Sequence, residues 1–124
     1  MGPLGAAVCY DLRFPEMIRR LARVGAEALL VPAEWPRPRT GHWELLLRAR
    51  AVENGFFVLG ANRVGSQAGQ AFEGASQIVN PWGDVLARAG DGEGAALAEV
   101  DPAAAAEARR RIPVLEDRVP EVDG

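Results

Sequence analysis

Residues 4–25 have the sequence LGAAVCYDLRFPEMIRRLARVG, and this stretch decides the fold. Residues 4–9 are apolar without alternation, which is typical of a short strand buried on both faces. The apolar run stops at Cys9, and a helical pattern begins a few residues later. We therefore predict a strand, a tight turn and a helix, with the only cysteine of the chain at the junction.

Four apolar residues define one face of the helix in this unit: Phe14, Met17, Ile18 and Leu21. Pro15 and Glu16 stand in its first turn, where a missing N–H and a negative charge are favourable, and Gly25 marks its end. The alternation continues, because residues 26–33 predict a second buried strand and residues 42–54 a second helix. This order favours parallel strands joined by right-handed crossovers in an α/β fold.

The second helix has the strongest helical pattern in the sequence. Its predicted core stripe consists of Leu45, Ala49, Val52 and Phe56. Glu44 and Arg48 are spaced as an i,i+4 ion pair. The segment before this helix, residues 34–41, is predicted to be a loop because its two prolines oppose regular structure.

The pattern changes after a third buried strand, which is predicted over residues 56–65. The later predicted elements are a loop over 66–74, short antiparallel strands over 75–81, 84–90 and 95–101, and a helix over 102–113. No internal boundary is evident, so residues 1–124 are predicted to form a single partial domain. A core strand that begins at residue 4 normally lies beside earlier strands, so we predict the C-terminal portion of a larger α/β fold.

Composition excludes several classes of partner. The chain has 124 residues, of which 48% are hydrophobic and 25% charged, as expected for a soluble globular protein. The formal net charge is −3, so the chain has no excess of positive charge, and neither a nucleic acid nor a membrane is expected as partner. No long apolar run or targeting segment is evident, which favours the cytoplasm. One cysteine and one histidine cannot form a zinc site, so we expect no metal.

Cys9 has two interpretations that its local sequence leaves open. A side chain at the end of a strand and before a helix points out of the carboxyl edge of the sheet, where open α/β folds place their sites. Free cysteine is also among the most buried residue types and often acts as a small hydrophobe. A catalytic thiol needs help, because only a few per cent of an unperturbed thiol is ionised at neutral pH. It requires a general base and a cation or further donors for the oxyanion.

Four other residues are candidates for this site, each with a structural alternative. His42 is the only base that titrates near neutral pH, and it also suits a capping or packing role. Arg13 can bind a substrate carboxylate or form a structural ion pair. Trp35 can wall a pocket or cover the sheet edge, and Glu16 can lie near the site or complement helix amides.

The motifs VCYDLRFPE, LLVPAEWPRPR, HWELLLRARAVENGFFVLGANRVG and GASQIVNPWGDVLA together resemble the C-terminal half of a nitrilase-superfamily carbon–nitrogen hydrolase. The resemblance runs from about residue 4 to residue 118 and is greatest to the omega-amidase-like branch, which hydrolyses amides of 2-oxo acids such as 2-oxoglutaramate. It implies that Cys9 attacks the amide carbon, that a thioester forms, and that the backbone N–H of Tyr10 helps to hold the oxyanion. It further implies no cofactor, a small-molecule amide substrate, a four-layer α-β-β-α sandwich and, for the complete protein, a homodimer or higher homo-oligomer.

The chain departs from this family in one respect. The lysine, the general-base glutamate and a supporting glutamate of the family all precede the nucleophile, whereas this sequence has eight residues before Cys9 and no lysine. We therefore expect the N-terminal portion of the sandwich to be missing and the isolated chain to show little or no catalysis. Two alternatives remain at this point, a non-catalytic binding or assembly module and a Cys–His hydrolase that uses Cys9 and His42.

Overall fold

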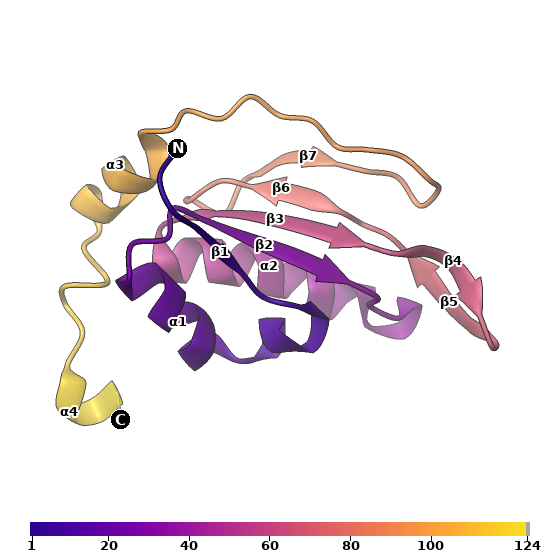
Figure 1. Ribbon diagram of the computed structural model, residues 1–124, viewed down its shortest axis with the longest axis horizontal. Helices are drawn as coiled ribbons and strands as arrows, with labels where there is room; N and C mark the ends of the chain where they lie inside the picture. Colours follow the sequence, from indigo (N-terminus) through magenta and orange to yellow (C-terminus); the bar gives the residue numbers. More distant parts are fainter. Residues whose placement is uncertain (124) are drawn as a thin grey trace.

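A five-stranded sheet with the strand order β1-β2-β3-β6-β7 forms the centre of the molecule (Figure 1). The computed structural model describes residues 1–123. The strands of this sheet are β1 (Leu4–Ala6), β2 (Ala28–Ala33), β3 (Phe57–Asn62), β6 (Gln77–Val79) and β7 (Val85–Arg88). Helices α1 (Pro15–Arg23) and α2 (Thr40–Asn54) connect the first three strands and lie on one side of the sheet. The predicted α/β class is confirmed.

The direction of the strands changes once across the sheet. Strands β1, β2 and β3 are parallel, and the β3–β6 and β6–β7 pairs are antiparallel, as the sequence predicts. Ala33 is the register partner of Asn62, so β2 and β3 end at the same edge. Just beyond β1, the N–H of Ala7 donates to the Leu30 carbonyl at 3.0 Å. The segments that follow the three parallel strands therefore begin at one edge of the sheet.

Helix α2 packs on the sheet through a different face from the predicted one. Of the predicted core stripe, Leu45 is 65% exposed and Val52 is 53% exposed, whereas Phe56, just beyond the helix, is fully buried as predicted. The buried residues of the helix are Trp43, Leu47, Arg50, Ala51 and Asn54. Gly55 ends the helix with a left-handed backbone, as expected from its position.

Two polar residues on the buried face of α2 explain why its hydrophobic periodicity predicted the wrong face. The Nε of Arg50 donates to the Leu12 carbonyl at 3.0 Å, and its Nη1 pairs with Glu53 at 3.0 Å. The side-chain amide of Asn54 donates to the Arg50 carbonyl at 2.9 Å. Polar groups with such partners can be buried, although a count of apolar residues assigns them to solvent.

The predicted pair between Glu44 and Arg48 is wrong for a related reason. Glu44 accepts from Arg88 on β7 at 2.8 Å, and Arg48 donates to the Gly83 carbonyl at 2.8 Å. Both side chains thus have partners that are distant in sequence, which local spacing does not reveal.

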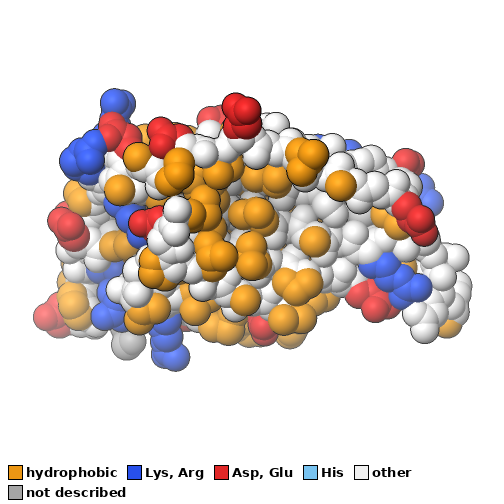
Figure 2. Space-filling view, turned by 45° about the horizontal axis from the view of Figure 1, so that its top comes forward, with side chains coloured by type: hydrophobic (Ala, Val, Ile, Leu, Met, Phe, Trp, Pro, Cys, Tyr) orange, Lys and Arg blue, Asp and Glu red, His pale blue; other side chains and the backbone are white. Residues whose placement is uncertain are grey.

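The side of the sheet opposite the helices is also apolar. An added side chain at Gly5 or Gly60 would meet Leu21 or Leu47 of the helices, so the residues that alternate with these glycines point the other way. By register, the outward residues of the parallel strands are Leu4, Ala6, Ala28, Leu30, Pro32, Phe57, Leu59 and Ala61. Figure 2 shows hydrophobic side chains gathered across the middle of one face of the molecule.

The first strand is shorter and more exposed than predicted. We expected a strand over residues 4–9 that is buried on both faces, but β1 ends at Ala6, and both Leu4 and Ala6 are exposed. The physical reason is its place at the edge of the described sheet, where only β2 pairs with it.

A β-hairpin occupies most of the segment that was predicted as a loop over residues 66–74. Strands β4 (Val64–Gln67) and β5 (Gln70–Glu73) pair antiparallel. Ala68 and Gly69 between them both have positive φ, at 50° and 80°, which suits a two-residue hairpin turn. Alanine is uncommon in such a turn, so the sequence carried no clear hairpin signal.

The loop predicted over residues 34–41 likewise contains regular structure. A turn of 3₁₀ helix, η2 (Arg37–Arg39), precedes α2, which begins at Thr40. Proline is tolerated in the first turn of a helix because the N–H that it lacks has no helical acceptor there. The presence of Pro38 within η2 therefore corrects our argument that the prolines exclude helical turns.

The C-terminal segment passes over the sheet to the helix α3 (Ala104–Arg111) (Figure 1). The strand predicted over residues 95–101 is wrong, because this segment is neither strand nor helix and Leu97 is 90% exposed. No described strand pairs with it. A short helix, α4 (Pro120–Asp123), follows in the C-terminal tail.

Arg109 anchors α3 to the rest of the fold. Its Nε and Nη2 donate to the carbonyls of Asn54 and Ala26, at 3.1 Å and 2.6 Å. Burial lowers the pKa of the Arg109 guanidinium, and the nearby Glu27 carboxylate opposes this change. Helix α3 is thus tied to the end of α2 and to the connection between α1 and β2.

Candidate active site

Three connections meet at the carboxyl edge of the parallel strands. Cys9 follows β1, Trp35 follows β2, and β3 ends at Asn62. Open α/β sheets bind ligands at this edge. Cys9 and Trp35 both line one hollow there, which makes it the candidate site.

Cys9 has an unusual backbone conformation. Its φ is +48°, a left-handed value that costs a residue other than glycine about 1–2 kcal/mol. The residue begins a 3₁₀ helix, η1 (Cys9–Arg13), and its side chain is half-buried against the core. Strain of this kind is concentrated at functional sites, including the strained turns that present nucleophiles.

Hydrogen bonds within the turn hold this conformation. The N–H of Val8 donates to Oδ2 of Asp11 at 2.9 Å, and the N–H of Asp11 donates back to the Val8 carbonyl at 3.0 Å. The Asp11 carbonyl then accepts from the N–H of Phe14 at 3.0 Å. Asp11 therefore has the amide-capping role that is favoured at the start of a helix.

Tyr10 contributes its backbone rather than its side chain to this geometry. The ring is exposed and packs edge-on against Phe14, with ring centroids 5.3 Å apart. The N–H of Tyr10 lies in the first turn of η1, where a helix provides no carbonyl acceptor. This N–H adjoins Cys9 directly along the chain.

Arg13 and Trp35 are stacked beside the cysteine. The guanidinium carbon of Arg13 lies 4.8 Å from the centroid of the Trp35 ring. Trp35 is only 3% exposed, and its Nε1–H donates to the Arg39 carbonyl at 2.9 Å. Trp35 is thus a wall of the site. No carboxylate in residues 1–123 pairs with Arg13, so the structural ion pair considered for it is not formed there.

His42 contacts Arg13 and not the cysteine. Its Nδ1 lies 3.2 Å from Nη2 of Arg13. Because a guanidinium can only donate, Nδ1 is the acceptor, and the proton of a neutral ring is then on Nε2. His42 is exposed and does not line the hollow, and no hydrogen bond joins it to Cys9 within residues 1–123. The geometry therefore gives no support to a Cys–His pair.

The hollow has a volume of about 370 Å³. Its lining residues are Cys9, Tyr10, Arg13, Trp35, Pro36 and Arg39. Four of the six sequence candidates, namely Cys9, Tyr10, Arg13 and Trp35, are therefore brought together. Glu16 is exposed in the first turn of α1 and is not in the lining. None of the lining residues is acidic, and two are arginines.

Asn62 is a residue of this region that our sequence reasoning missed. Its Oδ1 accepts from the Trp35 N–H at 2.7 Å, and its Nδ2 donates to the carbonyls of Trp35 and Gly74, at 3.3 Å and 2.8 Å. The signal would have been an asparagine at the end of β3, the parallel strand two positions along the sheet from the strand that precedes Cys9. Arg39 was missed because it lies in a segment that we treated only as a loop.

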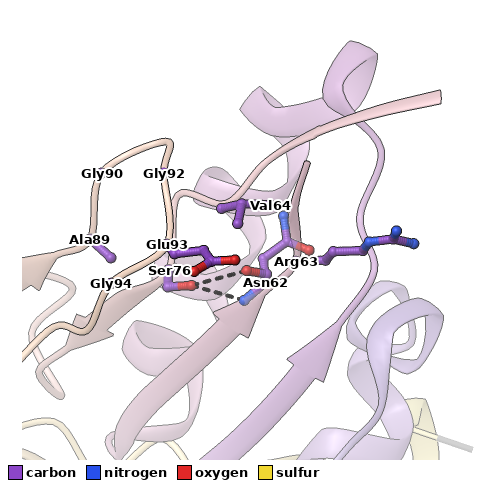
Figure 3. Close-up of a pocket in the computed structure, with 9 residues that line it drawn as sticks. All are labelled: Asn62, Arg63, Val64, Ser76, Ala89, Gly90, Gly92, Glu93 and Gly94. Atoms are coloured by element: carbon purple, nitrogen blue, oxygen red, sulfur yellow. Dashed lines mark hydrogen bonds between the residues drawn. The ribbon is translucent and has the colours of Figure 1, made fainter. Parts of the chain in front are cut away.

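Ser76 supports Asn62 from the neighbouring strand connection. Its Oγ accepts from the Asn62 N–H at 2.9 Å and lies 3.4 Å from the Asn62 carbonyl. Figure 3 shows this pair beside the glycine-rich segment around Glu93, with which it lines a second hollow of about 320 Å³. The polar residues of its lining are Asn62, Arg63, Ser76 and Glu93, and Cys9 does not line it.

Within residues 1–123, no group of three or more His, Cys, Asp or Glu side chains is placed to hold a metal ion. No helix in this part of the chain has the length and apolar character needed to cross a membrane.

The chain belongs to the carbon–nitrogen hydrolase family, whose model matches residues 1–110. It is 50% identical over 110 residues to the 2-oxoglutaramate amidase of Bacillus subtilis, a match that covers 89% of this chain and 42% of that protein. It is 42% identical over 125 residues to the deaminated glutathione amidase of Homo sapiens, covering 99% of this chain and 38% of that protein. The chain thus spans about 40% of the length of these relatives.

Solved structures of the nitrilase superfamily have the same fold. A carbon–nitrogen hydrolase from Helicobacter pylori superimposes with a TM-score of 0.91 at 33% identity, over 97% of this chain and 47% of that one. A variant of the amidase from Nesterenkonia sp. AN1, at 37% identity and a TM-score of 0.82, covers 96% of this chain and 42% of that one. It has the acetamide moiety of fluoroacetamide added covalently at its active-site cysteine. The predicted nitrilase-like α/β fold is confirmed.

Proposed function

We propose that this chain is the nucleophile-bearing part of an amidase that forms a thioester at Cys9. The thiolate of Cys9 attacks the amide carbon, the amide nitrogen takes up a proton, and the C–N bond breaks so that ammonia leaves and a thioester remains. Water then attacks the thioester, which releases the carboxylic acid and regenerates the thiol. The observation that carries the proposal is the strained Cys9 turn, which presents the thiol to a hollow at the carboxyl edge.

The neighbouring groups have different roles in this reaction. The N–H of Tyr10 is the proposed donor to the oxyanion. A fixed donor of this kind stabilises the negative charge that develops on the carbonyl oxygen in the transition state. Trp35 excludes water from one side of the hollow because it is almost fully buried. Arg13 lies on the Trp35 ring, and its proposed role is to contact a charged group of the substrate.

General acid–base catalysis is not assigned to any residue of this chain. The lining of the hollow has no carboxylate, and the sequence has no lysine. Ionising the thiol and stabilising the oxyanion both need such groups. We propose that a glutamate and a lysine from outside these 124 residues complete the site.

The proposed substrates are amides of 2-oxo acids, with 2-oxoglutaramate as the first to test. Two facts support this choice. The relative from Bacillus subtilis is named for 2-oxoglutaramate, and the substrate for which it is named carries a carboxylate, which suits the basic lining of the hollow.

Ammonia release from 2-oxoglutaramate tests the proposal. A chimera places the part of the Bacillus subtilis amidase that precedes the matched region in front of this chain. We expect the chimera to release ammonia, its Cys9→Ala variant to release none, and the 124-residue chain alone to show little or no turnover. A folded chimera that is inactive, or one that keeps its activity after Cys9→Ala, contradicts the proposal.

A further inference from the structure

Four arginines lie in or beside the segment between β2 and α2, and they differ in whether they pair with an acidic residue. Arg37 pairs with Glu73 at 2.7 Å, and Arg63 pairs with Glu34 at 2.8 Å. Arg13 and Arg39 have no acidic partner among residues 1–123. These last two are the arginines that line the hollow beside Cys9.

The two lining arginines differ in how they are held. The guanidinium of Arg13 is fixed by the Trp35 ring and by His42. The backbone of Arg39 is fixed, because its carbonyl accepts from the Trp35 Nε1–H at 2.9 Å and its N–H donates to the Pro36 carbonyl at 3.0 Å. Its guanidinium has no hydrogen-bond partner in the described residues. Arg39 is therefore an exposed residue whose backbone is fixed beside the hollow and whose side-chain donors are unused among the described residues.

An unused guanidinium in a basic hollow is suited to an anion. Its planar donors match a carboxylate in bidentate geometry, and a second nearby cation increases the attraction. The paired Arg37, only two residues away, has its charge neutralised by Glu73 and does not line the hollow. Of these two arginines, only Arg39 has an unpaired positive charge among the described residues, and it is the one that lines the hollow beside Cys9.

We propose that Arg39 is the specificity-determining residue of the site, and that with Arg13 it binds a carboxylate on the molecule that reacts at Cys9. The inference deepens the proposed amidase function, because it selects amides that carry a negative charge over neutral amides. It concerns binding of an anion next to the thiol, and it therefore has a test that does not depend on amide hydrolysis.

Alkylation of Cys9 provides this test in the 124-residue chain. Iodoacetate and iodoacetamide react alike: the thiolate forms an S–C bond, the C–I bond breaks, and iodide leaves with the electron pair. Only iodoacetate carries a carboxylate. Cys9 is the only thiol, so intact-mass spectrometry measures both rates without ambiguity. The ratio of the iodoacetate rate to the iodoacetamide rate reports the recruitment of an anion.

Arg39→Gln should lower this ratio about threefold, the effect of one opposite unit charge at about 6 Å in water. Arg37→Gln is the matched control and should leave the ratio unchanged. In the unmodified chain, the ratio should fall with added salt toward the value of the Arg39→Gln variant, because salt screens exposed charges. This salt series needs no variant and keeps the test valid if a substitution disturbs folding.

Equal ratios in the Arg39→Gln variant and the unmodified chain would overturn the inference, as would an equal effect of Arg37→Gln or a ratio insensitive to salt. Failure of the amidase proposal is a separate result. It would appear as a folded chimera that releases no ammonia while the alkylation ratio still depends on Arg39.

Discussion

The side chain of Asn62 hydrogen-bonds both peptide groups of Trp35, accepting from its N–H at 2.7 Å and donating to its carbonyl at 3.3 Å. The same amide donates to the Gly74 carbonyl at 2.8 Å. One residue at the end of β3 therefore fixes the wall of the candidate site and joins it to the connection before β6.

Asn62→Asp should destabilise the protein by about 1–3 kcal/mol. The substitution keeps the acceptor for Trp35 but removes the Nδ2 donor, which leaves a carboxylate facing two carbonyl oxygens. Urea unfolding measures the change in free energy. Gln67→Glu makes the same chemical change on an exposed strand and should cost less than about 0.5 kcal/mol. Equal losses for the two variants would count against the role given to Asn62.

Gly60→Ala should cost about 1–3 kcal/mol through overpacking. A Cβ at this position would lie 2.7 Å from both Trp43 and Leu47, which are fully buried. Gly41→Ala is the opposite case, since nothing lies within 4 Å of its added Cβ in α2. It should stabilise the helix by up to about 1 kcal/mol. Thermal unfolding of both variants checks the predicted difference in sign.

Cys9→Gly should be more stable than Cys9→Ala by about 1 kcal/mol. The positive φ of Cys9 strains any side chain, and only glycine relieves it. Ala68→Gly in the hairpin turn, where φ is also positive, should give a similar gain. If chemical denaturation shows Cys9→Ala to be as stable as Cys9→Gly, the turn at the cysteine is not strained.

Arg109→Leu should lower the free energy of unfolding by about 1–3 kcal/mol, because the Asn54 and Ala26 carbonyls lose their donors. Arg110→Leu is the control, since the only pair of Arg110 among residues 1–123 is an exposed one with Glu107 on the same helix, and its loss should cost less than about 0.5 kcal/mol. Calorimetry of both variants measures the contrast, and a larger loss for Arg110→Leu would refute the anchoring role of Arg109.

The parts of the fold that could be predicted from sequence are those in which local pattern and tertiary packing agree. Helix α1 begins at Pro15 and buries Ile18, as its spacing predicted, although Phe14 of the predicted apolar face is 44% exposed. The buried face of α2 could not be found in this way, because Arg50 is satisfied by the Leu12 carbonyl, 38 positions earlier in the chain. A hairpin with Ala68 in its turn was equally invisible, because a positive φ at alanine has no sequence signal.

The site residues that lie in a sequence motif could be predicted. Those that are distinguished only by their tertiary contacts could not. Cys9, Arg13 and Trp35 were identified from the sequence, and they line or adjoin one hollow. Arg39 was not identified from the sequence. It differs from Arg37 because Arg37 pairs with Glu73, and Glu73 lies on a hairpin that the sequence did not indicate.

The reversal of strand direction after β3 has a consequence for the order in which the protein folds. Contacts between residues close in sequence are enough to form the turn at Cys9, but Trp35 is held by Asn62, and Asn62 by Ser76 just before β6. These two pairings join residues 27 and 14 positions apart, and such non-local contacts form more slowly than local ones. The wall of the site therefore becomes fixed only when the sheet is nearly complete, so a partly folded chain would expose its thiol before it has a pocket.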